Sequence, residues 1–417
     1  MKKTFFLLAL CFIISVNILS QQVINDSNMD SIMQVMRKRS DSIAAVNRTN
    51  FLILFASMPH DTTGRINIRH MGFKNLPDFG DFDNISSINA SKNKLKKIRK
   101  KDIDIDSLKY LNLSENNLRK ARFPKKSKII SLDLSDNELR KIPRSLRNLK
   151  QLKNLTINDN HIKRIPRFFR KMPNLESIEI NFNKVKYNKH AVKNFKHIET
   201  LVIAGNNIDK IPENISDMYK VKTLNYSKNN ISDVPPTFAD LDSLETIIFY
   251  KNSFDSIPIE ITKQKKLKII DFYYNNIEKI PIEVGNLQNL KMIFLAYNNI
   301  ETLPDTLRSL SKLTAFYIHD NRLAHVPAWI TKLSNLAILD ISYNKLFSIP
   351  DLSQMPELYE VDIQENNLDH FPWELMEKPN LKLLIIKGNP FILDEEEKEQ
   401  LVITLKEKRA SGVIIVD

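Results

Sequence analysis

Asparagine recurs at a nearly constant interval along most of this 417-residue chain. The spacing is 23 residues in every case but two, which are 21 and 22. Self-similarity at such a short period indicates an array in which each unit packs on its neighbours, so a long chain need not divide into several globular domains. The recurring residues are Asn93, Asn116, Asn137, Asn160, Asn183, Asn206, Asn229, Asn252, Asn275, Asn298, Asn321, Asn344, Asn366 and Asn389.

Each of these asparagines follows a fixed hydrophobic pattern. Leu108, Leu111, Leu113, Asn116 and Leu118 form L-x-x-L-x-L-x-x-N-x-L, and other copies repeat it. The x-L-x-L-x alternation predicts a short strand with one face inward, and stacked copies then form a parallel sheet. A buried amide can bond the backbone groups that the following turn leaves unpaired, which predicts a structural ladder of asparagines.

This pattern resembles the leucine-rich-repeat family from about Arg65 to Asn389. In the second half of most copies, a hydrophobic residue followed by proline stands at one fixed position. This Ile-Pro variant is similar to the 23-residue repeat class found in Ras-scaffold, plant intracellular Ras-group and many bacterial repeat proteins. The resemblance implies an α/β leucine-rich-repeat solenoid of about 15 repeats, a curved arc with parallel β-sheet on the concave face and turns or short helices on the convex face. The resemblance also implies that the protein binds other proteins and has no catalytic activity of its own. The pairs are Ile142-Pro143, Ile165-Pro166, Ile211-Pro212, Val234-Pro235, Ile257-Pro258, Ile280-Pro281, Leu303-Pro304, Val326-Pro327, Ile349-Pro350 and Phe371-Pro372.

Two copies depart from the rule. The Ile-Pro pair is missing after Val185, where Tyr187 to His190 replace it, and the unit around Ala121 to Pro124 is shortened. Because the asparagine register is kept in both, we expect local changes on the convex side without a break in the sheet.

The sequence predicts four parts: a signal peptide (1–20), an N-terminal cap region (21–62), the solenoid (63–390) and a C-terminal cap (391–417). Lys2 and Lys3 precede an apolar run ending near Leu19, which is typical of export to the periplasm, the cell surface or the medium. Two alternatives stay open: retention of this run as a membrane anchor, and lipid modification of Cys11. After signal cleavage we expect no membrane-spanning segment, because no other run is long enough.

The ends of an array expose apolar surface and need caps. Residues 27–47 predict an amphipathic helix, followed by the apolar run Phe51 to Phe55. At the C-terminus, Asp394 and the acidic residues after it predict a helix start, and Gly412 predicts its end. Val413 to Val416 then predict a last strand.

No motif for catalysis or for a cofactor is present. Cys11 is the one cysteine and lies in the signal, so a mature chain has no thiol for catalysis or metal binding. Asp133, Asp136 and Asp159 could together contact a cation, although solvated strand-face residues are the better interpretation. We therefore expect no enzyme, no cofactor and no metal.

The concave positions change character along the array. In the first copies they are small or polar: Asn89, Ser91, Asn112, Ser114, Asp133, Ser135, Thr156 and Asn158. From the eighth copy they are mostly aromatic. Clustered exposed aromatics are enriched at protein interfaces, so they predict a site for a protein partner, although large residues could also merely shield the sheet. This aromatic patch consists of Ile248, Tyr250, Tyr273, Tyr274, Phe294, Tyr297, Tyr317, His319 and Tyr343.

Charge is also unevenly divided in this chain of net charge +13. Residues 91–200 hold 30 Lys and Arg against 11 Asp and Glu, a net of +19, whereas residues 201–417 hold 23 against 31, a net of −8. Basic residues recur at one repeat position, and this basic ladder could bind an anionic glycan, lipid head groups or an acidic protein. A merely solvated flank explains the ladder equally well, and nucleic acid is not expected. The ladder consists of Lys96, Lys97, Arg119, Lys120, Arg140, Lys141, Lys163 and Arg164.

Together these features predict an exported, non-catalytic protein that holds a protein partner on the concave face. The alternative is a surface component that binds anionic polysaccharide or lipid head groups through the basic ladder. Salt should discriminate between them, because screening weakens exposed charge pairs more than aromatic contacts.

Overall fold

The computed structural model describes residues 41–55, 64–79, 82 and 84–417. The predicted signal peptide, with Cys11, lies outside the described residues, as does much of the predicted N-terminal cap region. The chain divides into two compact units, Met1–Met58 with His70–Phe73, and Pro59–Arg69 with Lys74–Asp417. Each is described by itself.

In the first unit, residues 41–55 are helical. The helix includes the run Phe51 to Phe55, which the sequence led us to place after it. The Phe51 ring lies 5.2 Å from that of Phe55 and 6.1 Å from that of Phe73. Nη1 of Arg48 donates to the carbonyl oxygens of Met71 and Gly72, each at 3.2 Å. The role of this helix as a cap stays a prediction.

The second unit is built on one parallel sheet, which has 16 strands within the part of the chain that is described. The strands follow chain order across the sheet, so each repeat adds one strand beside the previous one. They are β1 (Gly64–Asn67), β2 (Ile85–Asn89), β4 (Tyr110–Asn112), β6 (Ser131–Asp133), β7 (Asn154–Thr156), β8 (Ser177–Glu179), β9 (Thr200–Val202), β10 (Thr223–Asn225), β11 (Thr246–Ile248), β12 (Ile269–Asp271), β13 (Met292–Phe294), β14 (Ala315–Tyr317), β15 (Ile338–Asp340), β16 (Glu360–Asp362), β17 (Leu383–Ile385) and β18 (Ile414–Val416).

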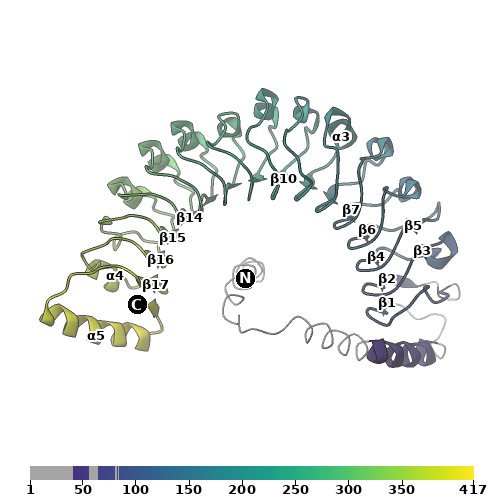
Figure 1. Cartoon of the computed structure of the whole chain (residues 1–417), viewed down its shortest axis with the longest axis horizontal. Helices are drawn as coiled ribbons and strands as arrows, with labels where there is room; N and C mark the ends of the chain where they lie inside the picture. The colour runs from purple at the N-terminus through teal and green to yellow at the C-terminus, as the bar shows by residue number, and fades with distance from the viewer. Residues whose placement is uncertain (1–40, 56–63, 80–81, 83) are drawn as a thin grey trace, which may run out of the picture. The chain divides into compact units, whose positions relative to one another are not determined.

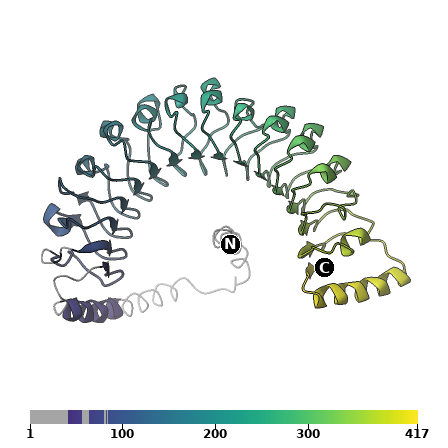
Figure 2. The ribbon, with the colours of Figure 1, turned by 180° about the vertical axis from the view of Figure 1, so that it is seen from behind.

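The alternation of side chains explains where this sheet lies. In β13, Ile293 is buried, whereas Met292 and Phe294 on either side of it remain partly exposed. The inward residues of successive repeats stack into one continuous core, and the outward residues line the inner side of the curved unit (Figure 1; Figure 2 shows it from behind). The predicted α/β solenoid with a concave parallel sheet is confirmed.

The outer side carries short helices, most of which begin after the proline of the repeat. The proline is the N-cap residue of most of these helices, where its fixed φ suits the turn and a backbone N–H would have no partner within the helix. These 3-10 helices are η1 (Lys100–Ile103), η2 (Arg144–Asn148), η3 (Arg167–Lys171), η4 (Ile215–Asp217), η5 (Pro236–Asp240), η6 (Ile261–Lys263), η7 (Ile282–Asn286), η8 (Asp305–Ser309) and η9 (Ala328–Lys332); α4 (Trp373–Met376) is a short α-helix.

Both irregular copies change only on the outer side, as predicted. Helix α3 (Lys189–Asn194) replaces the missing Ile-Pro turn, and the Asn188 side chain caps it. Tyr187 lies one residue before the isoleucine position of the repeat, and its buried hydroxyl lies 2.8 Å from that of Tyr226. Strands β8, β9 and β10 keep their register past this point.

The asparagines form the predicted ladder. Nδ2 of Asn275 donates to the carbonyl oxygens of Phe249 (3.0 Å) and Phe272 (2.9 Å). Its Oδ1 accepts the Phe254 N–H at 3.1 Å. One amide thus joins its own repeat to the preceding one, and the other ladder residues make equivalent bonds, for example Asn298 and Asn321.

At the C-terminus, the predicted helix and last strand are both present. Helix α5 (Glu395–Ala410) begins with a capping box in which Asp394 and Glu397 bond each other's backbone N–H. Strand β18 then pairs with β17 and ends the sheet. Among the described residues, no helix is both long and apolar enough to cross a bilayer.

Candidate functional site

One position on the concave side has an unusual backbone in every copy. The residue before each ladder asparagine has a positive φ, between 48° and 74°. This left-handed region suits glycine and is sterically unfavourable for bulky side chains. Glycine occurs there twice, whereas Phe182, Tyr274, Tyr297 and Tyr343 are aromatic. The full set is Lys92, Glu115, Asp136, Asp159, Phe182, Gly205, Lys228, Lys251, Tyr274, Tyr297, Asp320, Tyr343, Glu365 and Gly388.

Four tyrosines and one histidine of the predicted aromatic patch form a continuous Tyr–His cluster: Tyr250, Tyr273, Tyr274, Tyr297 and His319. The rings of Tyr274 and Tyr297 stack with centroids 4.1 Å apart and planes at 10°. Tyr273 lies 5.7 Å from Tyr250, 5.2 Å from Tyr297 and 5.5 Å from His319. The cluster spans four repeats.

Phe294 and Tyr317 form a separate ring pair on β13 and β14. They are register partners, and their rings are parallel within 2° at a centroid distance of 4.9 Å. Ile248, at the end of β11, and Tyr343 complete the predicted patch, and the Tyr343 ring contacts no other ring among the described residues. Tyr343 is 47% exposed, and burial together with the charges of Glu365, Asp320 and Asp362 raises its pKa.

His319 connects the rings to the acidic residues that follow. Its Nε2 lies 3.2 Å from the Tyr273 hydroxyl, and its Nδ1 lies 2.8 Å from Oδ2 of Asp340. Burial opposes the charged imidazole, but the bond to Asp340 and the charges of Asp340, Asp320 and Asp362 together raise the pKa of His319. The imidazole is therefore held between a phenol and a carboxylate.

Three carboxylates on this face were not among the residues predicted from the sequence. Asp271, Asp340 and Asp362 occupy the same strand position as Phe294 and Tyr317 and face the same side. Burial raises the pKa of Asp271 to about 6 and, with the charge of Asp340, that of Asp362 to about 7. One signal could have revealed them: the last strand position, which is asparagine at Asn89 and Asn112, is aspartate in several later copies.

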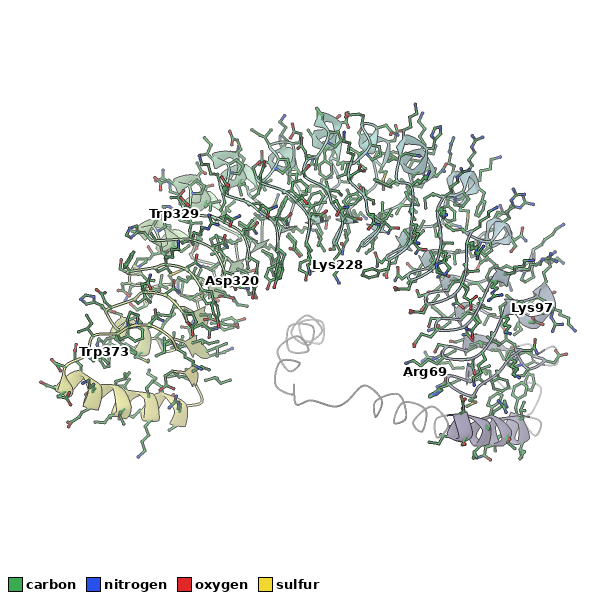
Figure 3. All side chains as sticks on the ribbon, in the orientation of Figure 1. Arg69, Lys97, Lys228, Asp320, Trp329 and Trp373 are labelled. Carbon is green, nitrogen blue, oxygen red and sulfur yellow. The ribbon has the colours of Figure 1, made fainter. Side chains whose placement is uncertain are left out.

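Asp320 adds to this charge on the concave side, where Figure 3 labels it together with Lys228. Burial raises the pKa of Asp320. Burial also raises the pKa of the neighbouring Tyr297, as do the charges of Asp320 and Tyr274.

The N-terminal half of the concave face is polar, as predicted. Asn89 and Asn112 each accept an N–H from the serine two residues later. Phe182 is an aromatic exception that the predicted patch did not include. Its ring lies beside Gly205 of the next repeat, where an added Cβ would approach within 2.5 Å, and Nζ of Lys228 lies 5.3 Å from its centroid.

The basic ladder is exposed throughout, and part of it lies in a second sheet. Strands β3 (Lys97–Ile98) and β5 (Lys120–Ala121) pair in parallel, with Lys97 opposite Lys120. This sheet lies towards the outer side (Figure 1), and Figure 3 labels Lys97 there. Arg119 pairs with Glu138 at 2.6 Å, whereas the other seven ladder residues form no ion pair with any described residue.

Asp133 ends strand β6, whereas Asp136 and Asp159 lie at the left-handed position before Asn137 and Asn160. Oδ1 of Asp133 accepts the Ser135 N–H at 2.9 Å. Burial raises the pKa of Asp136 and of Asp159, and neighbouring acidic residues add to each shift. Across the described ranges, no group of three His, Cys, Asp or Glu side chains is placed to hold a metal ion.

Comparison with known proteins places this geometry among leucine-rich repeats. Residues 255–385 match a family model described as leucine-rich repeat region, and residues 128–149 match one described as leucine rich repeat. The chain is similar to a leucine-rich-repeat protein of Leptospira interrogans, at 25% identity and a TM-score of 0.74, covering 84% of this chain and 95% of that one. A search of curated proteins gave no match.

Two further structures share the fold, and each match covers less than two thirds of the other chain. The plant peptide hormone receptor RGFR1, in complex with RGF2, is 25% identical with a TM-score of 0.58, covering 79% of this chain and 61% of the receptor. TLR13, in complex with ssRNA13, is 20% identical with a TM-score of 0.62, covering 84% of this chain and 54% of the other.

Proposed function

This chain is a member of the leucine-rich-repeat family, and from that premise we propose that it is an exported, non-catalytic protein that holds a protein partner on the aromatic patch. The observation that carries the proposal is the Tyr–His cluster beside the Phe294–Tyr317 ring pair, all on one face. Aromatic side chains on a rigid sheet provide large contact area at a small cost in conformational entropy. Export rests on the N-terminal sequence, Lys2 and Lys3 before the apolar run.

Backbone strain supports a functional role for the patch. Tyr274, Tyr297 and Tyr343 have φ values of 57°, 53° and 50°. A left-handed residue with a Cβ costs roughly 1–2 kcal/mol, which glycine avoids. The same position is glycine in two other copies, at Gly205 and Gly388. Such strain is commonly retained where the side chain serves a function.

The charge of the patch favours a protein partner over nucleic acid. Asp271, Asp340 and Asp362 share the face with the aromatic rings, and a phosphate backbone would be repelled there. The ssRNA complex of TLR13 therefore supplies no precedent for this surface. The peptide hormone receptor in complex with RGF2 is the nearer analogy, because the partner in our proposal is also a polypeptide.

Affinity capture with matched variants tests the proposal. The mature chain, the double variant Phe294→Ala, Tyr317→Ala and the control Asn89→Ala, Thr156→Ala are immobilised and exposed to the same surface extract. A partner of the patch should bind the wild type and the control but be lost from the ring variant. Truncating an anchor in such a cluster commonly costs about 2 kcal/mol or more, roughly thirtyfold in affinity. If the partner were lost from the control variant alone, the binding site would lie in the N-terminal half of the sheet.

A second function is favoured by one observation on the basic ladder. Lys97 and Lys120 stand opposite each other on paired strands, and like charges in that arrangement are destabilising. A surface ligand with anionic groups, such as a polysaccharide or lipid head group, would relieve the repulsion. Reversal of Arg119, Lys120, Arg140 and Lys141 to glutamate should then abolish retention on a heparin-like resin while changing the melting temperature little.

Salt separates the two functions. Binding of an anionic polymer through the ladder should collapse between low and high ionic strength, whereas docking on the aromatic patch should mostly persist. Unchanged retention of the charge-reversed variant on the resin would show that the basic ladder does not bind anionic polymers.

A further inference from the structure

A single row of side chains combines aromatic rings with carboxylates on the concave face. Asp271, Phe294, Tyr317, Asp340 and Asp362 are consecutive register partners on strands β12 to β16. The parallel ring pair therefore has one carboxylate on one side and two on the other. Neighbouring strands are about 4.8 Å apart, so the row extends over roughly 19 Å, the length of about six extended residues.

The negative charge in this row is not needed for local structure. Oδ1 of Asp271, of Asp340 and of Asp362 each accepts the N–H two residues later, at 2.9, 3.2 and 3.1 Å. Asn89 and Asn225 make the same bond at the equivalent position, at 3.1 and 2.9 Å. A neutral asparagine thus satisfies the turn, and the charge has another cause.

The same charge is costly where it stands. Burial raises the pKa of Asp271 and of Asp362, and the charge of Asp340 on the adjacent strand raises that of Asp362 further. Burial and Asp340 likewise raise the pKa of Glu360, at the first position of β16. A folded chain that holds ionised carboxylates against burial gains stability when an opposite charge approaches them.

Elsewhere the chain neutralises such charges within itself. At the start of the strands, Lys153 pairs with Glu176 of the next repeat at 2.9 Å. Glu199 and Lys222 do the same at 2.7 Å, as do Glu245 and Lys268 at 2.6 Å. In contrast, the concave strand positions of β12 to β16 contain no lysine or arginine. Among described residues, Asp340 forms an ion pair with His319, whereas Asp271 and Asp362 form none.

We propose that the protein partner presents a basic segment to this row, with lysine or arginine side chains over the Phe294–Tyr317 rings and beside the carboxylates of Asp340 and Asp362. The inference rests on the proposed function, that the aromatic patch holds a protein. Ring faces attract cations, and the aliphatic stems of lysine and arginine pack on aromatic surface. Rings and carboxylates in one row therefore recognise both parts of such a side chain.

Synthetic peptides of equal length test the inference directly. The basic peptide carries lysine and arginine at alternate positions. The glutamine peptide has glutamine at all of these positions, and the glutamate peptide has glutamate there. Titrated against the full mature chain by calorimetry, the basic peptide should bind at least about tenfold more tightly than the glutamine peptide, because charge complementarity supplies the difference. The glutamate peptide should show no binding. Equal affinity for the basic and glutamine peptides, or no binding of the basic one, overturns the inference.

Matched variants locate the effect. Asp340→Asn with Asp362→Asn keeps the turn bonds and should lower affinity for the basic peptide at least about tenfold. Asp133→Asn, at the same repeat position in the polar half, should leave it unchanged. Thermal melts of all three chains check that each is folded. Unaltered affinity in the double variant overturns the inference.

The ring variant Phe294→Ala, Tyr317→Ala distinguishes the two levels of the proposal. If it loses binding of basic and glutamine peptides alike while the asparagine variants lose none, the aromatic patch binds protein without selecting charge. In that case the inference fails and the proposed function stands. If neither pair of substitutions affects binding of any peptide or captured partner, the proposed function itself fails.

Discussion

The hydroxyl of Tyr273 lies 3.2 Å from Nε2 of His319, although the two residues stand two repeats apart. Two strand spacings separate their backbones by about 9.6 Å, which two long side chains can cross only if the intervening one is small. That residue is Ala296, which is completely buried. Phe182 and Lys228 approach each other across Gly205 in the same way. Small residues thus leave room for side chains of alternate repeats to contact each other on this face.

The bridge between Tyr273 and His319 should not tolerate a larger residue at position 296. We expect Ala296→Leu to displace both side chains and to lower partner affinity as severely as loss of the Phe294–Tyr317 pair. Overpacking at a buried site costs about 1–3 kcal/mol, so the chain should remain folded with a lower melting temperature. Ala204→Leu, at the same position of a repeat without the cluster, serves as the control. Full affinity in Ala296→Leu would show that the bridge is dispensable.

His319 should titrate above its ordinary range. Its pKa is raised because the bond to Asp340 and nearby carboxylates outweigh burial. A histidine with a raised folded pKa contributes stability that is complete below its unfolded pKa of about 6.5 and is lost as pH rises through the folded value. Proton NMR of the imidazole should show this, and Asp340→Asn should lower the measured pKa. An ordinary pKa for His319 that stays the same in Asp340→Asn would contradict the contact between these two side chains.

Asp362 should make the fold less stable as pH rises. Its pKa is raised from 3.8 to about 7 by burial and by Asp340. The folded chain therefore holds this proton more tightly than the unfolded chain, and the resulting stability is present below pH ~4 and lost as pH approaches ~7. Asp362→Asn removes the titration and should raise the free energy of unfolding above pH ~7 by on the order of 1 kcal/mol.

Denaturant unfolding across this pH range measures the effect of Asp362→Asn. Asp351→Asn provides the control, because Asp351 is exposed and its Oδ1 accepts the Ser353 N–H, a bond that asparagine retains. A pH profile identical in wild type and Asp362→Asn would show that this carboxyl is not coupled to folding.

The sequence predicted the repeat because one periodic rule governs burial. Leu132, Ile178 and Ile293 obey the same alternation, so the strands and their order followed from the asparagine register alone. The left-handed residue before each asparagine could not be predicted this way. Tyr297 and Lys251 are not residues that signal a positive φ, and the neighbouring repeats impose that conformation on them.

The candidate site was predictable only in part. The rings of Tyr273 and Tyr297 were identified from their place after the strands, and the structure brings them together. The contact between Tyr273 and His319 depends on Ala296, which no search for large or charged residues would select. The carboxyl of Asp362 has a raised pKa because of burial and a neighbour on another strand, which are properties of packing between repeats.

The asparagine ladder should hold the repeats together. Asn275→Ala removes an amide that bonds carbonyl oxygens of Phe249 and Phe272 and the N–H of Phe254. Leaving such buried groups unpaired costs roughly 1–3 kcal/mol. Asn276→Ala changes the adjacent exposed asparagine and should cost almost nothing. Asn252→Ala removes the equivalent ladder bonds to Tyr226 and Phe249 and should also be destabilising. Melting temperatures of both ladder variants equal to that of Asn276→Ala would refute the role of the ladder.

Backbone strain at Tyr297 should reverse the usual order of two small substitutions. Its φ is 53°, and alanine keeps the steric conflict between Cβ and the backbone, whereas glycine has none. We therefore expect Tyr297→Gly to be more stable than Tyr297→Ala by about 0.5–1 kcal/mol, although both lose the stack on Tyr274. At Phe294, in an extended strand, alanine should instead be the more stable. Urea unfolding of the four variants decides the point. If alanine were also better at position 297, the left-handed backbone would not be strained, and the tyrosines there would need no function to explain them.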